Sequence, residues 1–229
     1  MRYRSMARQA GFTLIEIAIV LVIIGILIVG VLQGTEMIEN SKTKSILQDM
    51  RGIAAAYNSY YDRYRALPGD ETAATMTARG WLGATGGAGT GVLTIAPATA
   101  FTTGAPEGPG FWRALTASGF VSGNPAAAYL ASLPTHRGEG RIAVVTGPVY
   151  GLAGTFVCAS GLSTKQVAAL DTLVDGAPPA TQIGNNIGNF LADTGAANPL
   201  PPTAAAPTAR AYNVTLVTTP WTGCMRISG

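Results

Sequence analysis

Charged residues are scarce in this sequence. They make up 12% of the 229 residues, against roughly 25% in ordinary soluble domains. With 48% hydrophobic residues, this composition excludes an intrinsically disordered chain. Three of the 15 Lys and Arg residues lie in the first eight positions, as Arg2, Arg4 and Arg8. The rest of the chain then has 12 basic and 12 acidic residues. Because it has no basic patch to neutralise phosphates, we expect no nucleic-acid partner.

Residues that carry chemistry are also few. The single histidine, His136, lies in the turn-like stretch 134–138. No Gly-x-Ser-x-Gly motif accompanies it, so we interpret it as a solvated loop residue rather than a catalytic base. Asp171 and Asp175 are four residues apart on one predicted helical face, where they are weak candidates for calcium ligands. Two carboxylates alone specify little, and the sequence predicts neither an enzyme nor a cofactor.

The longest apolar run is residues 12–32, FTLIEIAIVLVIIGILIVGVL, in which Glu16 is the only charged residue. As a helix with a rise of about 1.5 Å per residue, it spans the roughly 30 Å of a membrane's hydrocarbon core. A signal peptide has a shorter apolar region and a cleavage site behind it, so we expect this run to remain as an anchor. The basic residues before it place the N-terminus in the cytoplasm and everything after Leu32 outside it.

Glu16 is unusual, because a carboxylate in an apolar span is costly and such residues mark function. It belongs to residues 11–16, GFTLIE, which lie between a short basic leader and the apolar run. This arrangement resembles the N-terminal signature of type IV prepilins, which the pseudopilins of type II secretion systems share. The resemblance is close over about residues 8–65. It implies that a prepilin peptidase cuts between Gly11 and Phe12 and methylates the new N-terminus.

The resemblance also implies a role for Glu16 in assembly. Cleavage would create a cationic amine at Phe12, which Glu16 of a neighbouring subunit can neutralise when the helices stack with a stagger. A well-made pair is much less costly in hydrocarbon than two isolated charges. Such a pair would fix the register of the helices, as buried polar residues do in coiled coils. A pair between Phe12 and Glu16 of the same subunit is the competing arrangement, and the sequence does not choose between them.

An apolar stripe continues the helical pattern beyond the span. Its residues recur at steps of four and three, and they are Ile46, Met50, Ile53, Tyr57, Tyr60 and Tyr64. The pattern predicts one helix from about Thr13 to Tyr64, whose stripe packs against the exported body. Residues 67–70, LPGD, have strong turn chemistry and end it.

The remaining chain alternates short elements with turns. The expected elements are an irregular connection over 80–110, a helix over 111–120, strands over 141–146, 149–158 and 212–218, and a helix that starts at 163 and ends at 176. Gly147 and Pro148 separate the first two strands, which predicts a hairpin. Ser163 and Gln166 form a capping-box pattern at the start of the second helix.

One long helix followed by a small sheet is an α+β fold, the layout of pilin-like proteins. The expected organisation is a removed leader at 1–11, a transmembrane and assembly helix at 12–33, its amphipathic continuation at 34–66 and an exported body at 67–229. Cys158 and Cys224 are 66 residues apart, which excludes a CxxC motif. Because an exported compartment is oxidising, we expect them to pair and to tie the last strand to the hairpin. Many pilins close a C-terminal region in this way.

These features predict a structural subunit, a major or minor pilin, of a type IV pilus-like filament. Its expected partners are the prepilin peptidase, other pilin subunits, the inner-membrane assembly machinery and the lipid bilayer. The precursor would be a single-pass inner-membrane protein with a periplasmic body, before it enters an extracellular pilus or a periplasmic pseudopilus. The alternatives are a pseudopilin of a type II secretion system and a single-pass anchored enzyme or ligand-binding domain. The last alternative leaves Glu16 unexplained.

Overall fold

A computed structural model describes residues 12–81, 86–176, 187–195, 199–204, 212 and 219–228. The chain divides into two compact units, Met1–Ser41 and Lys42–Gly229. The predicted leader at 1–11, which includes Gly11, lies outside the described residues. So does all but the first residue of the strand predicted over 212–218.

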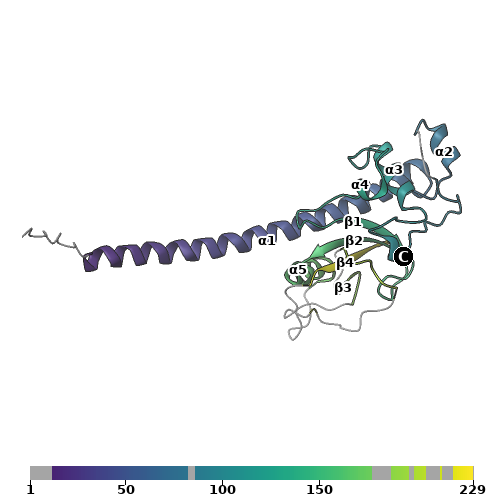
Figure 1. The fold of residues 1–229 in the computed structure, drawn as a ribbon. Helices are drawn as coiled ribbons and strands as arrows, with labels where there is room; N and C mark the ends of the chain where they lie inside the picture. Colours follow the sequence, from purple (N-terminus) through teal and green to yellow (C-terminus); the bar gives the residue numbers. More distant parts are fainter. Residues whose placement is uncertain are drawn as a thin grey trace, which may run out of the picture. The chain divides into compact units, whose positions relative to one another are not determined.

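One helix, α1 (Leu14–Tyr64), runs through both units (Figure 1). The predicted continuous helix is therefore confirmed. Its first part is apolar and exposed, with a mean hydropathy of 3.2, and is long enough to cross a membrane. This length of apolar helix agrees with the span predicted over 12–33, whose exact limits remain a prediction.

The second part of α1 supplies a core face to the unit that begins at Lys42. The predicted stripe forms this face, because Ile46, Met50, Ile53, Tyr57 and Tyr60 are buried and Tyr64 is partly buried. After Tyr64 the backbone of Arg65 turns left-handed, with φ 55°, and its N–H donates to the carbonyl of Tyr61 at 2.8 Å. Helices often end in such a left-handed residue. The helix thus ends just before the predicted turn at 67–70.

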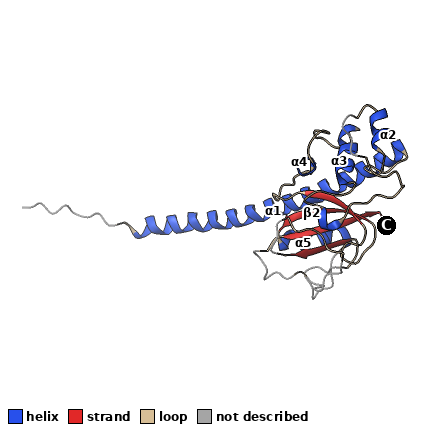
Figure 2. Cartoon of the chain, turned by 45° about the vertical axis from the view of Figure 1, so that its right-hand side comes forward, coloured by secondary structure: helices blue, strands red, loops and turns tan. Residues whose placement is uncertain are grey.

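In the part of the chain that the structure describes, four antiparallel strands form one sheet, drawn in red in Figure 2, and their order is β1-β2-β4-β3 (Figure 1). Strands β1 (Ile142–Thr146) and β2 (Thr155–Leu162) make the predicted hairpin. Strands β3 (Phe190–Thr194) and β4 (Trp221–Ser228) were not expected from the sequence. The last strand of the chain lies between β2 and β3. A long helix packed on a small antiparallel sheet confirms the α+β fold class.

The position predicted for the second strand of the hairpin, 149–158, is wrong. That strand begins at Thr155, because the chain first folds back on itself. The N–H of Gly147 donates to the carbonyl of Gly154 at 3.1 Å, and residues between them form a bridge of their own. The connection is therefore longer than the Gly-Pro turn that was expected.

The helices of the body are short. They are α2 (Ala73–Ala78), the 3-10 helix η1 (Pro97–Thr99), α3 (Gly108–Ala117), α4 (Tyr129–Ser132) and α5 (Thr164–Asp175). Helix α3 is the one expected over 111–120, and it starts earlier because Pro109 fits the first helical turn. Helix α5 begins with the expected capping box, in which Ser163 and Gln166 exchange hydrogen bonds of 2.9 and 3.3 Å. It ends at Gly176, whose φ is 95°.

Candidate functional site

The N-terminal candidate site starts at Phe12, whose side chain is exposed. The backbone N–H and the hydroxyl of Thr13 donate to the same oxygen of Glu16, Oε2, at 2.7 and 2.8 Å. In return, the N–H of Glu16 donates to the hydroxyl oxygen of Thr13 at 3.3 Å. This reciprocal pattern is a capping box, and it begins α1. The carboxylate of Glu16 is therefore held in place by its own helix.

The capping box was not recognised in the sequence, although Thr13 to Glu16 fits the Thr-x-x-Glu pattern that signals it. The two predicted pairs of Glu16 with a Phe12 amine are not tested by it, because in the uncleaved chain the Phe12 nitrogen belongs to a peptide bond. Oε1 of Glu16 accepts no hydrogen bond from any residue that the structure describes. One oxygen of the carboxylate is thus bonded to Thr13, and the residue as a whole is exposed.

The apolar part of α1 offers a long surface with no cover in its own unit. All the large hydrophobic side chains from Leu14 to Leu32 are exposed. A contiguous apolar surface of this length is not stable in water and marks a contact with lipid or protein. The Thr13–Glu16 capping box therefore stands at the end of a surface that needs a partner.

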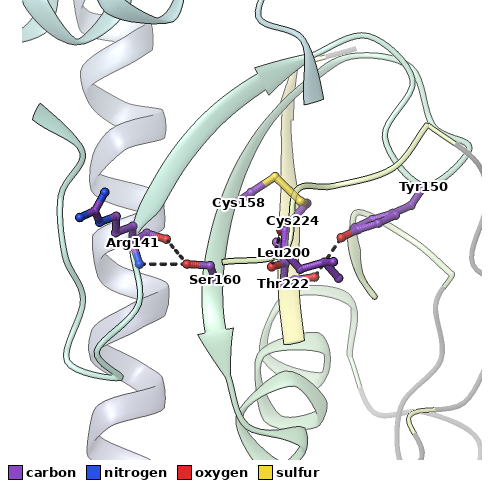
Figure 3. The surroundings of a disulfide bond; sticks show 7 residues. All are labelled: Arg141, Tyr150, Cys158, Ser160, Leu200, Thr222 and Cys224. Carbon is purple, nitrogen blue, oxygen red and sulfur yellow. Dashed lines mark hydrogen bonds between the residues drawn. A yellow bond between two sulfur atoms is a disulfide. The ribbon is translucent and has the colours of Figure 1, made fainter. Parts of the chain in front are cut away.

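Cys158 and Cys224 form the disulfide expected from the sequence (Figure 3). They are paired directly across β2 and β4, with their Cα atoms 4.0 Å apart, and both are fully buried. On one side of the bridge, the hydroxyl of Tyr150 donates to the carbonyl of Thr222 at 3.1 Å. The hydroxyl of Thr222 donates to the carbonyl of Leu200 at 2.8 Å. The last strand is thus fixed both covalently and by hydrogen bonds to neighbouring loops.

The interpretation of His136 as a solvated residue is wrong, because the side chain is only 5% exposed. Its Nδ1 accepts a hydrogen bond from the N–H of Gly138 at 3.0 Å, so we assign the ring proton to Nε2. Nε2 then donates to the carbonyl of Ser160 on β2 at 2.8 Å. Burial holds the pKa of His136 below its ordinary value of 6.5. The histidine ties its loop to the sheet, and its burial depends on long-range packing that no local pattern reveals.

The two weak calcium candidates make structural contacts. Asp175 accepts hydrogen bonds from the N–H groups of Asn189 and Phe190, at 2.9 and 2.7 Å, where β3 begins. Asp171 is buried. The pKa of Tyr212 is raised by the burial of its phenol and, to a lesser extent, by the negative charge of Asp171. Among the described residues, no group of three or more His, Cys, Asp or Glu side chains could hold a metal ion.

The structure also reveals two buried carboxylates that the sequence analysis did not single out. Asp70 accepts hydrogen bonds from the N–H groups of Thr90 and Gly91, at 2.9 and 2.7 Å. Glu107 accepts two more from backbone N–H groups in residues 88–94, at 3.2 and 2.6 Å. Backbone donors need partners when they are withdrawn from water. These carboxylates therefore accept the backbone hydrogen bonds that a neighbouring strand would accept in a sheet, and they hold the irregular segment 88–94 in place.

A third buried carboxylate, Glu71, lies beside the C-terminal end of α1. It accepts a hydrogen bond from the hydroxyl of Tyr60 and forms an ion pair of 2.5 Å with Arg79. The guanidinium of Arg79 also lies over the rings of Tyr64 and Trp81, 4.4 and 5.3 Å from their centroids. Burial and the nearby Glu71 carboxylate raise the pKa of Tyr60. We call Tyr60, Glu71 and Arg79 the triad, and it joins α1 to the segment that follows.

Comparison with known proteins places the functional signal in the first unit. Residues 6–32 match the family model of the prokaryotic N-terminal methylation motif. Comparisons with curated proteins and with solved structures find no match for this chain. The matched residues include Thr13, Glu16 and the whole exposed apolar run. The chain therefore carries the N-terminal signature of a type IV pilin- or pseudopilin-type protein.

Proposed function

We propose that this chain is a structural subunit of a type IV pilus-like filament. It is made as a prepilin, stored in the inner membrane, cleaved after Gly11, methylated at Phe12 and polymerised through α1. The observation that carries the proposal is the uncovered apolar surface of residues 14–32, which begins at a carboxylate held by a capping box. The methylation motif agrees with a structural subunit rather than an enzyme.

The same apolar surface contacts lipid in the precursor and the helices of other subunits in the filament. In the precursor, residues 12–33 lie in lipid with the basic leader in the cytoplasm and the body in the periplasm. During assembly the helices of other subunits replace the lipid around this surface. Leaving the bilayer costs hydrophobic free energy, and packing between apolar helices recovers most of it. The assembly machinery of the inner membrane supplies the remaining work.

Glu16 sets the register of the packed helices. Cleavage turns the Phe12 nitrogen into an amine with a positive charge, and the amine of an adjacent subunit pairs with the Glu16 carboxylate. Because Thr13 occupies only Oε2, the carboxylate is oriented by its own helix before the partner arrives and can accept the amine on Oε1. A charged pair in an apolar layer is stable only with good geometry, so it selects one stagger.

The test is the replacement Glu16→Ala in cells that express the peptidase and the assembly machinery. We expect the variant to be cleaved and inserted normally but to give no surface filaments in sheared fractions. Glu36→Ala, an exposed acid further along α1, is the matched control and should leave filament yield unchanged. Mass spectrometry of the mature chain should find N-methylated Phe12. A normal yield of filaments from Glu16→Ala would refute the pairing role.

A pseudopilin of a type II secretion system is the second candidate, because the methylation motif supports both kinds of protein. The two differ in where the polymer ends. A pilus subunit is recovered in filaments sheared from the cell surface, whereas a pseudopilin at ordinary expression stays within the periplasm. The same shearing experiment therefore separates the two candidates.

A further inference from the structure

A cleft of about 780 Å³ opens in the body beside the last turns of α1. One wall carries Tyr57, Asn58 and Tyr61, which recur at the spacing of one face of α1, and Arg65, which follows the end of that helix. All of its lining residues belong to the unit that starts at Lys42. Clefts of about 300–1,000 Å³ are the usual size of sites for small ligands.

The cleft is formed before any ligand arrives. Asp70 lies in its lining and holds Thr90 and Gly91 through hydrogen bonds to their N–H groups. Glu71, another lining residue, is fixed by the triad. Tyr57 is 7% exposed and its ring stacks near Phe111, with 6.5 Å between the centroids. A rigid lining lowers the entropy lost on binding.

Three side chains of this wall are available to a ligand. Asn58, Tyr61 and Arg65 are exposed and make no side-chain hydrogen bond or ion pair with any described residue. Tyr61 is 46% exposed, so a ligand can reach its side chain. The threonines Thr72 and Thr75, which also line the cleft, add hydroxyl groups that bond to each other at 3.0 Å.

The lining holds one cation, Arg65, that an anionic group of a ligand can reach. The carboxylate of Asp70 is used by backbone donors, and that of Glu71 is neutralised by Arg79. This leaves the guanidinium of Arg65 as the charged group of the lining without a partner among the described residues. A guanidinium binds a planar carboxylate through two parallel hydrogen bonds. A single cation is too little for a nucleic-acid backbone, which needs several.

We propose that this cleft binds an acidic saccharide, a sugar that carries a carboxylate. Arg65 pairs with the carboxylate, and the amide of Asn58 donates to and accepts from the sugar hydroxyls. The ring of Tyr61 packs on the apolar face of the pyranose, while its hydroxyl remains in contact with water. Remaining hydroxyls reach Thr72 and Thr75. This site does not depend on the filament role, because no lining residue belongs to the apolar part of α1.

The test is titration of the full chain in detergent micelles with a disaccharide of glucuronic acid and N-acetylglucosamine. The matched ligand is the same disaccharide with its carboxylate reduced to an alcohol. Arg65→Gln should weaken binding of the acidic disaccharide about tenfold, the loss expected for one charge-assisted pair, and leave the reduced ligand unaffected. Tyr61→Ala should weaken binding of both ligands. Each titration is followed by saturation-transfer NMR.

The control variant is Arg63→Gln, which removes an exposed positive charge two residues away, in the last turn of α1, but does not line the cleft. It should bind both ligands as the unmodified chain does. The proposal is overturned if the unmodified chain shows no saturable binding of the acidic disaccharide. It is also overturned if Arg63→Gln and Arg65→Gln weaken binding equally, or if both ligands bind equally well to the unmodified chain.

Discussion

Replacing Glu71 by Gln should weaken the body, because it leaves Arg79 without its carboxylate partner. The side chain of Glu71 is 5% exposed and that of Arg79 is 25% exposed. Removing one partner of a fully buried ion pair destabilises by about 3–5 kcal/mol. Arg79 keeps some access to water and its stacking on Tyr64 and Trp81, so part of this loss is recovered. We therefore expect a loss of about 2–3 kcal/mol in the free energy of unfolding.

Tyr60→Phe provides an internal comparison. It removes the hydroxyl that donates to Glu71 but leaves the ion pair with Arg79 intact. A hydrogen bond to a charged group contributes about 1.5–3 kcal/mol, so we expect a loss near the lower end of that range. The loss of unfolding free energy in the double variant should be smaller than the sum of the two single losses. The reason is that, once Gln replaces Glu71, the hydroxyl of Tyr60 no longer has a charged acceptor to lose.

The assay is urea unfolding of the full chain in detergent micelles, followed by tryptophan fluorescence, with Trp81 as a reporter close to the triad. Asp62→Asn removes an exposed acid from the same part of α1 and should change the free energy of unfolding by less than about 0.5 kcal/mol. If Glu71→Gln unfolds at the same urea concentration as Asp62→Asn, the triad does not stabilise the body and the reasoning fails.

Two further predictions concern the sheet. Replacing Cys158 and Cys224 by alanine opens a loop with a sequence separation of 66 and should lower the free energy of unfolding by about 4 kcal/mol, measured by the same urea assay; an unchanged midpoint would contradict this. Since the pKa of His136 is lowered in the folded chain, its stability contribution is complete above pH 6.5 and decreases as pH falls below that value. Unfolding from pH 8 to 5 should show this loss in the unmodified chain but not in His136→Gln, and parallel curves would refute it.

Local patterns predicted the elements that depend on local physics. The spacing of apolar residues predicted α1, and the capping box at Ser163 predicted the start of α5, because both signals lie within a few residues of the structure they cause. The hairpin was also predicted, since a turn signal separates its strands. The Thr13 capping box is an equally local feature, and its Thr-x-x-Glu spacing is sufficient to predict it.

Strands β3 and β4 could not be predicted locally. Strand β4 contains Gly223, a residue that weakens isolated strands, and its apolar residues do not alternate. The structure explains this glycine, because a Cβ there would lie 2.5 Å from the ring of Phe190 on the neighbouring strand. The burial of His136 and Glu71 has the same origin. His136 bonds to Ser160, which is 24 residues away, and the partners of Glu71 come from two different helices or their ends, so no single local pattern distinguishes either residue from a solvated side chain.

The two parts of α1 obey different physical requirements within one continuous helix. From Lys42 onward, its apolar stripe contributes to the core of the second unit, so substitutions at Ile46 or Met50 should act on the stability of the body. The apolar residues from Leu14 to Leu32 contribute to no core within their own unit, so under the proposed function substitutions there should act on membrane insertion and on assembly. A subunit that leaves lipid for a polymer needs this separation, because its body must stay folded while the surroundings of its anchor change.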